Sequence, residues 1–278
     1  MSVDLTQCSA VQLLAMYRSA QVSPVEVTQA VLARINQTQP VLNAFCLVDE
    51  EAALASARQS ETRWQQWRQS GAPVRALEGV PASIKDLILT RGWPTRRGSH
   101  TVNPDQAWEV DAPVTARLRE AGAVLLGKTT TPEFGCKGET NSPLTGITRN
   151  PWNLDTTPGG SSAGAAAIVA AGISPFAVGT DGGGSVRIPG SLAGLFAIKA
   201  HFGRVPIYPV SATHTLAHVG PMSRGVRDAA LALGVMAGFD ARDHTSALGP
   251  VPDFSAACER APKGLRVIYS RTLGYARP

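Results

Sequence analysis

The chain has 278 residues, of which 44% are hydrophobic and 17% are charged, and its formal net charge is +5. This length suffices for one large domain or two small ones around a substantial buried core. Its basic residues are dispersed and only 6% of its residues are aromatic, so no nucleic-acid partner is expected.

The N-terminus and the cysteines are typical of a protein in a reducing compartment. The first residues lack the basic segment and apolar run of a secretory signal. The longest apolar stretch, residues 163–172, is far too short to span a bilayer. The four cysteines have no paired spacing, which favours buried thiols over disulfides. We therefore expect a cytoplasmic protein that makes no membrane contact.

The first third of the chain has helical patterns. Residues 23–26, Ser-Pro-Val-Glu, form a capping box with proline at the first helical position, and apolar residues recur at helical spacing over 27–35. A second helix is expected from about Glu50 to Gln69. These patterns predict a mainly helical N-terminal part over residues 1–75.

From residue 78 onward, short apolar runs alternate with helical patterns. Strands are predicted at 80–84, 123–126, 175–178, 195–198 and 265–269, and helices at 113–120, at 162–172 and just after Ser185. Such alternation is typical of α/β layering around a sheet. Neither an internal repeat nor a linker divides the chain, so we expect a single domain over 1–278 with an α/β core over 76–278.

Two short motifs match known patterns in sequence but not in structural context. Residues 122–129 fit the phosphate-binding P-loop expression, yet the middle Ala-Val-Leu-Leu favours a buried strand over a loop. Residues 160–164 fit the G-x-S-x-G elbow with Ser162 as nucleophile. That elbow requires a preceding hydrophobic strand, whereas residues 153–158 are polar and contain a proline. We expect neither motif to perform the chemistry that its pattern suggests.

The lysines and histidines exclude two further classes of site. None of the five lysines has a serine three residues before it, as a Ser-x-x-Lys site requires. Among the five histidines only His214 and His218 have metal-ligand spacing, and they lie in a Pro/Thr/Gly-rich region that is not expected to be helical. No metal ion or other cofactor is therefore expected.

Two Ser/Gly-rich segments flank the helix at 162–172 and the strand that follows it. If this helix and strand run in opposite directions, the loops that contain Ser161 and Ser185 finish side by side. The glycines at 182–184 allow backbone N–H groups to converge on one point, as in an oxyanion hole, although a flexible turn would have the same composition.

A polar residue stands on either side of this second loop, and a nucleophilic serine in it would need a base. Asp181 and Arg187 are expected to pair and order the loop. No histidine lies close by in sequence, so a neutral lysine is the alternative, at a cost of about 4–5 kcal/mol for lowering its pKa from ~10.4 to about 7. Lys85 has apolar neighbours, but these considerations do not separate it from Lys128 or Lys199.

Taken together, a set of segments resembles the amidase signature family in order and in spacing. The segments are residues 79–86, 127–129, 150–153, 158–164 and 179–189, and the match continues through Lys199, 202–205 and 220–222. The resemblance covers nearly the whole chain. It implies a mixed central sheet covered by helices and hydrolysis of an amide through an acyl-enzyme.

The resemblance also implies a role for each matched residue. Ser185 is the nucleophile, Ser161 is a bridging serine that follows a cis peptide bond, and Lys85 is the base. The backbone N–H groups of residues 182–185, which include Gly182, Gly183 and Gly184, are expected to hold the oxyanion. Phe134 and Gly135 are expected to line the substrate pocket.

The resemblance leaves three functions open, because chains of this family are usually longer and this one is expected to lack the C-terminal part. The first is a stand-alone amidase for a small carboxamide, which residues 131–135 favour. The second is a glutamine-hydrolysing amidotransferase subunit that supplies ammonia to a partner protein. The third is a truncated, inactive fragment. A small-molecule amide is the expected substrate, and a homodimer is compatible with the resemblance.

Overall fold

The computed structural model describes residues 3–277, and a six-stranded mixed sheet lies at its centre. The spatial order is β1-β3-β2-β6-β8-β7. The strands are β1 (Phe45–Val48), β2 (Pro81–Lys85), β3 (Val124–Thr129), β6 (Phe176–Thr180), β7 (Phe196–Ala197) and β8 (Val219–Ser223). Strand β2 runs parallel to β3 and β6, whereas β1, β8 and β7 pair in antiparallel fashion. The predicted mixed sheet is confirmed. A separate hairpin joins β4 (Asn141–Ser142) to β5 (Gly146–Ile147).

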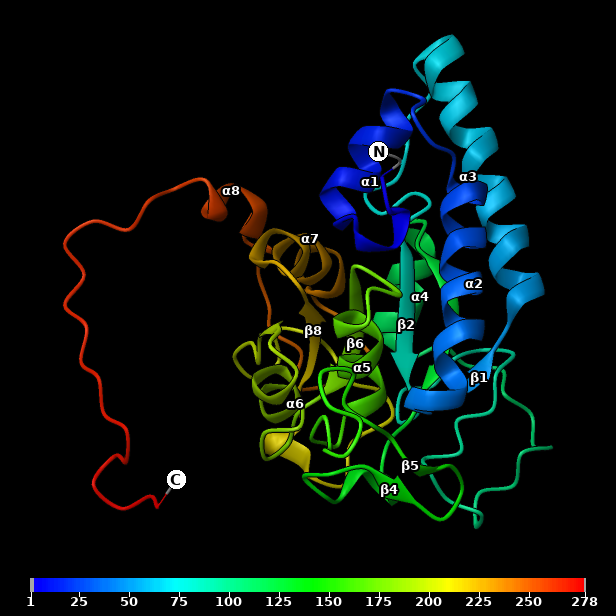
Figure 1. Ribbon diagram of the computed structural model, residues 1–278. Helices are drawn as coiled ribbons and strands as arrows, with labels where there is room; N and C mark the ends of the chain where they lie inside the picture. The colour runs from blue at the N-terminus through cyan, green and yellow to red at the C-terminus, as the bar shows by residue number, and fades with distance from the viewer. Residues whose placement is uncertain (1–2, 278) are drawn as a thin grey trace.

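Three α-helices precede β2 in the chain, and two of them hydrogen-bond to the segment just before it. They are α1 (Ala10–Arg18), α2 (Pro24–Leu42) and α3 (Glu50–Ser70), with α2 and α3 side by side in Figure 1. The predicted capping box is present at Ser23 and Glu26. Tyr17 of α1 donates a hydrogen bond to the Gly79 carbonyl at 3.0 Å, and Trp64 of α3 donates one to the Glu78 carbonyl at 3.1 Å. Buried aromatic side chains thus fix the chain just before β2.

The remaining helices complete the packing on the sheet. They are α4 (Pro113–Glu120), α5 (Ala163–Ala170), α6 (Arg187–Leu192), α7 (Val226–Met236) and α8 (Phe254–Cys258). Helix α5 shares one apolar core with α1, α2 and α3, whereas α4 and α7 form a second core with other side chains of the sheet. Every residue of α5 from Ala163 to Val169 is buried, because its small side chains let the sheet and helices approach on all sides.

The predicted elements are confirmed from residue 113 to 198, with small changes in their bounds. The prediction of a strand at 265–269 is wrong. A strand requires hydrogen-bonding groups of a neighbouring strand, and within the described residues none lies alongside this segment, where Ile268 is 94% exposed. Figure 1 shows the chain after α8 running apart from the sheet.

The cysteines and the lengths of the helices bear on two further predictions. All four cysteines are free, but only Cys8 is buried, and Cys136 is exposed. The expectation of four buried thiols is therefore wrong, because Cys136 lies in a surface loop. Between residues 3 and 277, every helix is too short or too polar to cross a bilayer.

Candidate active site

Lys85 is the last residue of β2 and is completely buried. Its Nζ lies 2.6 Å from Ser161 Oγ, 2.9 Å from Ser162 Oγ and 2.9 Å from Thr180 Oγ1. Strand β6 runs parallel to β2 and ends at Thr180, so both residues lie at the carboxyl edge of the sheet. The structure thus brings Lys85, and not Lys128 or Lys199, to the predicted serine.

The environment of Lys85 favours a neutral amine. Burial removes the ammonium group from water and lowers the pKa of Lys85 well below its ordinary value, although the negative charge of Asp181 opposes this shift. Three hydroxyl groups surround the nitrogen. Within the described residues, no carboxylate lies within ion-pair distance of it. A neutral amine can accept a proton, which is what a general base must do.

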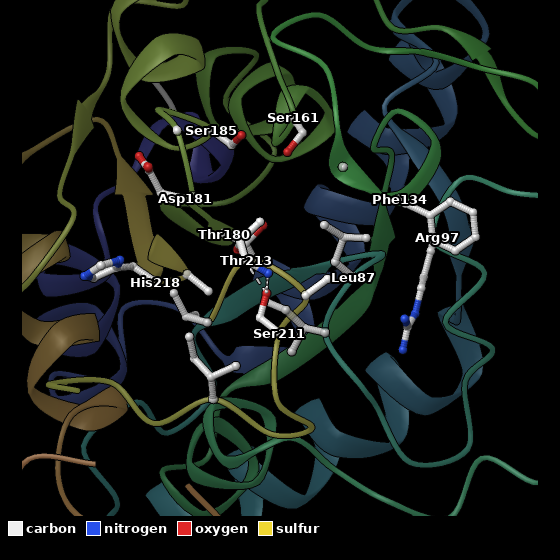
Figure 2. Close-up of a pocket in the computed structure, with 18 of the residues that line it drawn as sticks. Leu87, Arg97, Phe134, Ser161, Thr180, Asp181, Ser185, Ser211, Thr213 and His218 are labelled. Carbon is white, nitrogen blue, oxygen red and sulfur yellow. Dashed lines mark hydrogen bonds between the residues drawn. The ribbon is translucent and has the colours of Figure 1, made fainter. Parts of the chain in front are cut away.

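Ser161 lies at the end of the loop that leads into α5, and the Gly160–Ser161 peptide bond is cis, as the resemblance implies. The Ser162 N–H donates a hydrogen bond to the Ser185 carbonyl at 3.2 Å. The two serine loops are therefore adjacent, as the opposed directions of helix and strand predict. In Figure 2 the side chains of Ser161 and Ser185 lie on the same side of the pocket.

Ser185 and Ser161 both line a cavity of about 620 Å³. Ser161 is buried and Ser185 is partly exposed, so the Ser185 hydroxyl is the one more accessible to a ligand. Within residues 3–277 these two side chains make no hydrogen bond to each other. Catalytic hydrogen bonds are often long before a substrate binds, so the lack of a Ser161–Ser185 hydrogen bond here is compatible with proton transfer between them in a complex.

The glycine-rich loop before Ser185 is wrapped around the buried carboxylate of Asp181. Arg187 binds this carboxylate through two nitrogens, each at 2.9 Å, which confirms the predicted pair. The N–H groups of Gly184 and Val186 donate to it at 2.8 and 3.2 Å. Burial alone would raise the pKa of Asp181, but these hydrogen bonds, chiefly from Arg187, lower it below its ordinary value.

This wrapping corrects one part of the oxyanion prediction. The Gly184 N–H is directed at Asp181, so Gly184 shapes the loop and does not serve as a free donor. Its φ of +131° suits glycine. The N–H groups of Gly182, Gly183 and Ser185 have no backbone or side-chain acceptor within the described residues, and these three stay available to an oxyanion.

Phe134 and Gly135 lie on the pocket wall, where the sequence places them. Phe134 is 50% exposed and has a left-handed φ of +50°. Gly135 has a φ of +69°, and a Cβ there would lie 3.3 Å from Ser161 Oγ and 2.5 Å from a methyl group of Leu87. Glycine at 135 suits both the positive φ and the close approach of this loop to Ser161.

Sequence reasoning did not predict the contacts of several residues that surround Lys85, Ser161 and Ser185. Ser162, which the elbow motif offers as a nucleophile, is completely buried and binds Lys85 and Thr180. Thr180 could have been found from its position at the carboxyl end of a strand parallel to β2. Lys199, which the sequence offers as a candidate base and as part of the family match, instead contacts the glycine-rich loop, with Nζ 2.8 Å from the Gly182 carbonyl and 3.3 Å from Asp181.

The P-loop match at 122–129 has a structural explanation. Its middle residues form the buried strand β3, as expected, and its lysine is enclosed. Lys128 Nζ contacts the Ile88 carbonyl at 2.5 Å and Thr95 Oγ1 at 2.8 Å. Burial lowers the pKa of Lys128 to about 8, although Asp86 opposes this shift. Lys128 therefore holds the segment that follows Lys85, and its amine is enclosed by acceptors of that segment.

Comparison with known proteins gives one consistent family. The family described as Amidase matches residues 26–278. The A subunit of the glutamyl-tRNA(Gln) amidotransferase from Acidothermus cellulolyticus is 42% identical over 274 residues, which are 97% of this chain and 53% of that protein. The protein of the same name from Pseudomonas putida strain W619 is 44% identical over 243 residues, 87% of this chain and 49% of that protein.

Solved structures agree with this result. A bacterial aryl acylamidase of the amidase signature family is 39% identical with a TM-score of 0.83, over 90% of this chain and 51% of that chain. The peptide amidase from Stenotrophomonas maltophilia is 32% identical with a TM-score of 0.80, over 90% and 52% of the respective chains. This chain thus spans about half the length of the relatives that it matches. On its sequence match and its shared fold, the chain belongs to the amidase family, whose signature its serine- and glycine-rich loops carry.

Proposed function

We propose that this chain contains the acyl-transfer centre of an amidase, which hydrolyses a carboxamide to a carboxylate and ammonia or an amine. The observation that carries the proposal is the buried Lys85 amine, which lies 2.6 Å from Ser161 Oγ beside the loop of Ser185. Members of the family act on C–N amide bonds. The residues Lys85, Ser161 and Ser185 are proposed as its catalytic triad.

The contacts of Lys85 match the needs of a neutral amine. Such an amine has two N–H donors and one lone pair, and three hydroxyl oxygens surround Lys85 Nζ. The Ser162 hydroxyl already donates to the Thr180 carbonyl at 3.2 Å, so its oxygen is free to accept from Lys85. If Ser162 and Thr180 accept the two N–H groups, the lone pair of Lys85 faces the Ser161 hydroxyl.

The proposed reaction begins when a substrate carbonyl lies over Ser185. Lys85 takes the proton of Ser161 as Ser161 takes the proton of Ser185, and Ser185 Oγ bonds to the carbonyl carbon. The carbonyl electron pair moves to oxygen, where the N–H groups of Gly182, Gly183 and Ser185 are proposed to stabilise it. The C–N bond then breaks, and the leaving amine receives a proton from Ser161, which recovers one from Lys85.

The second half of the reaction repeats these steps with water. Water attacks the acyl group on Ser185 and gives its proton to Ser161 and thence to Lys85. The tetrahedral intermediate collapses, the carboxylate leaves, and Ser185 recovers its proton. Asp181 and Arg187 take no proton in this scheme, because their ion pair holds the loop in place.

An amidotransferase function is a second candidate, because the curated relatives at 42–44% identity are amidotransferase A subunits. In that case the amide is the side chain of glutamine and a partner protein receives the ammonia. The solved relatives at 32–39% identity are amidases in their own right, which favours the first function. A cytoplasmic location and a homodimer stay predictions, the latter for light scattering to test.

The test of the proposed function is hydrolysis by the purified chain. Acetamide, longer aliphatic amides, anilides and glutamine are incubated with it, and released ammonia or aniline is measured against a Ser185→Ala variant. Release from simple amides that depends on Ser185 supports the amidase function. Release from glutamine alone supports the amidotransferase function, and no release from any amide by folded protein contradicts both.

A further inference from the structure

Two cationic side chains line the 620 Å³ pocket without a counter-charge. Arg97 is half-buried and Lys137 is exposed at the surface of the same cavity. Within residues 3–277 neither side chain takes part in an ion pair. The guanidinium group of Arg97 also makes no hydrogen bond to a described residue, although it carries five donors.

The backbone around Arg97 is fixed, so the guanidinium group starts from a defined position. The Arg97 N–H donates to the Asp86 carbonyl at 3.1 Å, and the Arg97 carbonyl accepts from Phe134 N–H at 2.8 Å. The neighbouring N–H groups of Arg96 and Gly98 bind the buried Asp86 carboxylate, each at 3.1 Å. Asp86 directly follows Lys85, which ties this segment to the catalytic strand.

Arg97 also adopts a backbone conformation that is unfavourable for a residue with a side chain. Its φ of +56° lies in the left-handed region, where residues other than glycine, asparagine and aspartate are uncommon. Residues held in such conformations concentrate at functional sites. Gly92 and Gly98 of the same segment also have positive φ. The backbone conformation at position 97 would suit glycine, so it does not require arginine.

The one carboxylate on the pocket wall cannot neutralise Arg97. Asp181 is bound by Arg187 and by backbone N–H groups, and it lies across the pocket from Arg97 in Figure 2. Figure 2 also places Arg97 next to Phe134, away from His218. The pocket therefore has an anionic group already paired on one side and a cationic group without a partner on the other.

We propose that Arg97 is a specificity-determining residue, which binds the carboxylate of a substrate whose amide carbonyl reaches Ser185. The substrate class is an amide acid, with a carboxamide at one end and a carboxylate at the other. A planar guanidinium group matches a carboxylate through two parallel hydrogen bonds. A cavity of 620 Å³ is of the size that encloses a small-molecule ligand. This assignment rests on the proposed function only for the position of the amide.

Binding of matched ligands to a Ser185→Ala protein tests the assignment without turnover. The ligands are succinamate, glutaramate and adipamate, each compared with its neutral methyl ester, and dissociation constants come from ligand-observed NMR. For at least one chain length we expect the acid to bind about tenfold more tightly than the ester. Arg97→Gln should remove this preference and leave binding of the ester unchanged.

Three further variants separate a specific contact from a general effect of charge. Arg91→Gln removes an exposed arginine of the same segment that does not line the pocket, so the preference should persist. Lys137→Gln should retain most of it. Arg97→Lys keeps the charge but loses the fork, so an intermediate preference is expected, and this variant also serves if Arg97→Gln does not fold.

Equal binding of acid and ester, or no binding of either, would overturn the proposal, as would a preference that survives Arg97→Gln or disappears with Lys137→Gln. The outcome is independent of catalysis. Labelling of Ser185 by a fluorophosphonate probe reports on the nucleophile and does not involve a carboxylate. If Ser185 of the unmodified protein is not labelled while the Ser185→Ala protein still binds the acid more tightly than the ester, the proposed function is contradicted and the role of Arg97 is not.

Discussion

Replacing Lys85 by methionine removes the proposed base and keeps a side chain of similar length. The amine makes three hydrogen bonds, and the Ser162 hydroxyl keeps its bonds to the Thr180 backbone when the amine is removed. The hydroxyls of Ser161 and Thr180 lose their described partner, but only Ser161 is buried, since Thr180 is partly exposed to water. One unsatisfied buried hydroxyl costs about 1–3 kcal/mol, which the removal of a buried amine partly offsets. We therefore expect a folded variant in which reaction of Ser185 with a fluorophosphonate is about 10²–10⁴-fold slower, the usual contribution of a general base.

The pH dependence of that labelling makes the test sharper. With Lys85 present, the rate should rise as the amine loses its proton and reach a plateau below the ordinary lysine pKa of ~10.4, because burial lowers the pKa of Lys85. The methionine variant should show a slow rate with no such rise.

Lys128→Met is the matched control, because Lys128 is the other completely buried lysine and has a pKa of about 8. This variant should keep the pH profile of the unmodified protein. If folded Lys85→Met protein is labelled at the unmodified rate, or if Lys128→Met abolishes the pH dependence, Lys85 is not the base.

Further measurements on substituted proteins test the surroundings of the site. Asp181→Asn should lower the free energy of unfolding by about 2 kcal/mol at neutral pH and slow Ser185 labelling, since Arg187 loses its carboxylate; urea denaturation measures the first effect. As the pH rises from ~8 to ~10.4, the free energy of unfolding of the unmodified protein should increase by about 3 kcal/mol, because in this range the unfolded chain binds a proton at Lys128 that the folded chain has lost. Lys128→Met should abolish this increase. Denaturation across this pH range measures it. Gly184→Ala should destabilise the protein, because its Cβ would lie 2.8 Å from Ile188 at a φ of +131°, whereas Gly183→Ala has open space and should change stability by less than about 0.5 kcal/mol; thermal melts compare the two.

Much of the fold follows from local patterns in the sequence. The capping box at Ser23 and the proline at position 113 mark helix starts that the structure reproduces. The alternation of apolar runs and helices predicts the central strands, because each run is buried on both faces of the sheet. The adjacency of the two serine loops follows from the lengths of the helix and strand between them if these run in opposite directions, and the Ser162–Ser185 backbone hydrogen bond bears it out.

The site itself depends on contacts between residues that are distant in sequence. Lys85 and Ser161 are 76 positions apart, and periodicity does not reveal that a particular lysine reaches a particular serine. Lys199 follows β7, and the pairing of β7 with β8 brings its amine to the Gly182 carbonyl. Sequence patterns do not reveal this strand pairing, so they do not predict the contact. The wrong prediction of a strand at 265–269 has a related cause. Residues that favour strands form one only where a partner strand lies alongside, and the local sequence does not show whether it does.

The most direct test of the account is to locate the covalent adduct of a fluorophosphonate probe on the folded chain. After labelling, the protein is digested and the modified peptide is sequenced by mass spectrometry. Ser185, Ser161 and Ser162 lie on two separable segments, 159–164 and 181–189. The account predicts a single adduct on Ser185 that disappears in Ser185→Ala. An adduct on Ser162, or no adduct on folded protein, would contradict it.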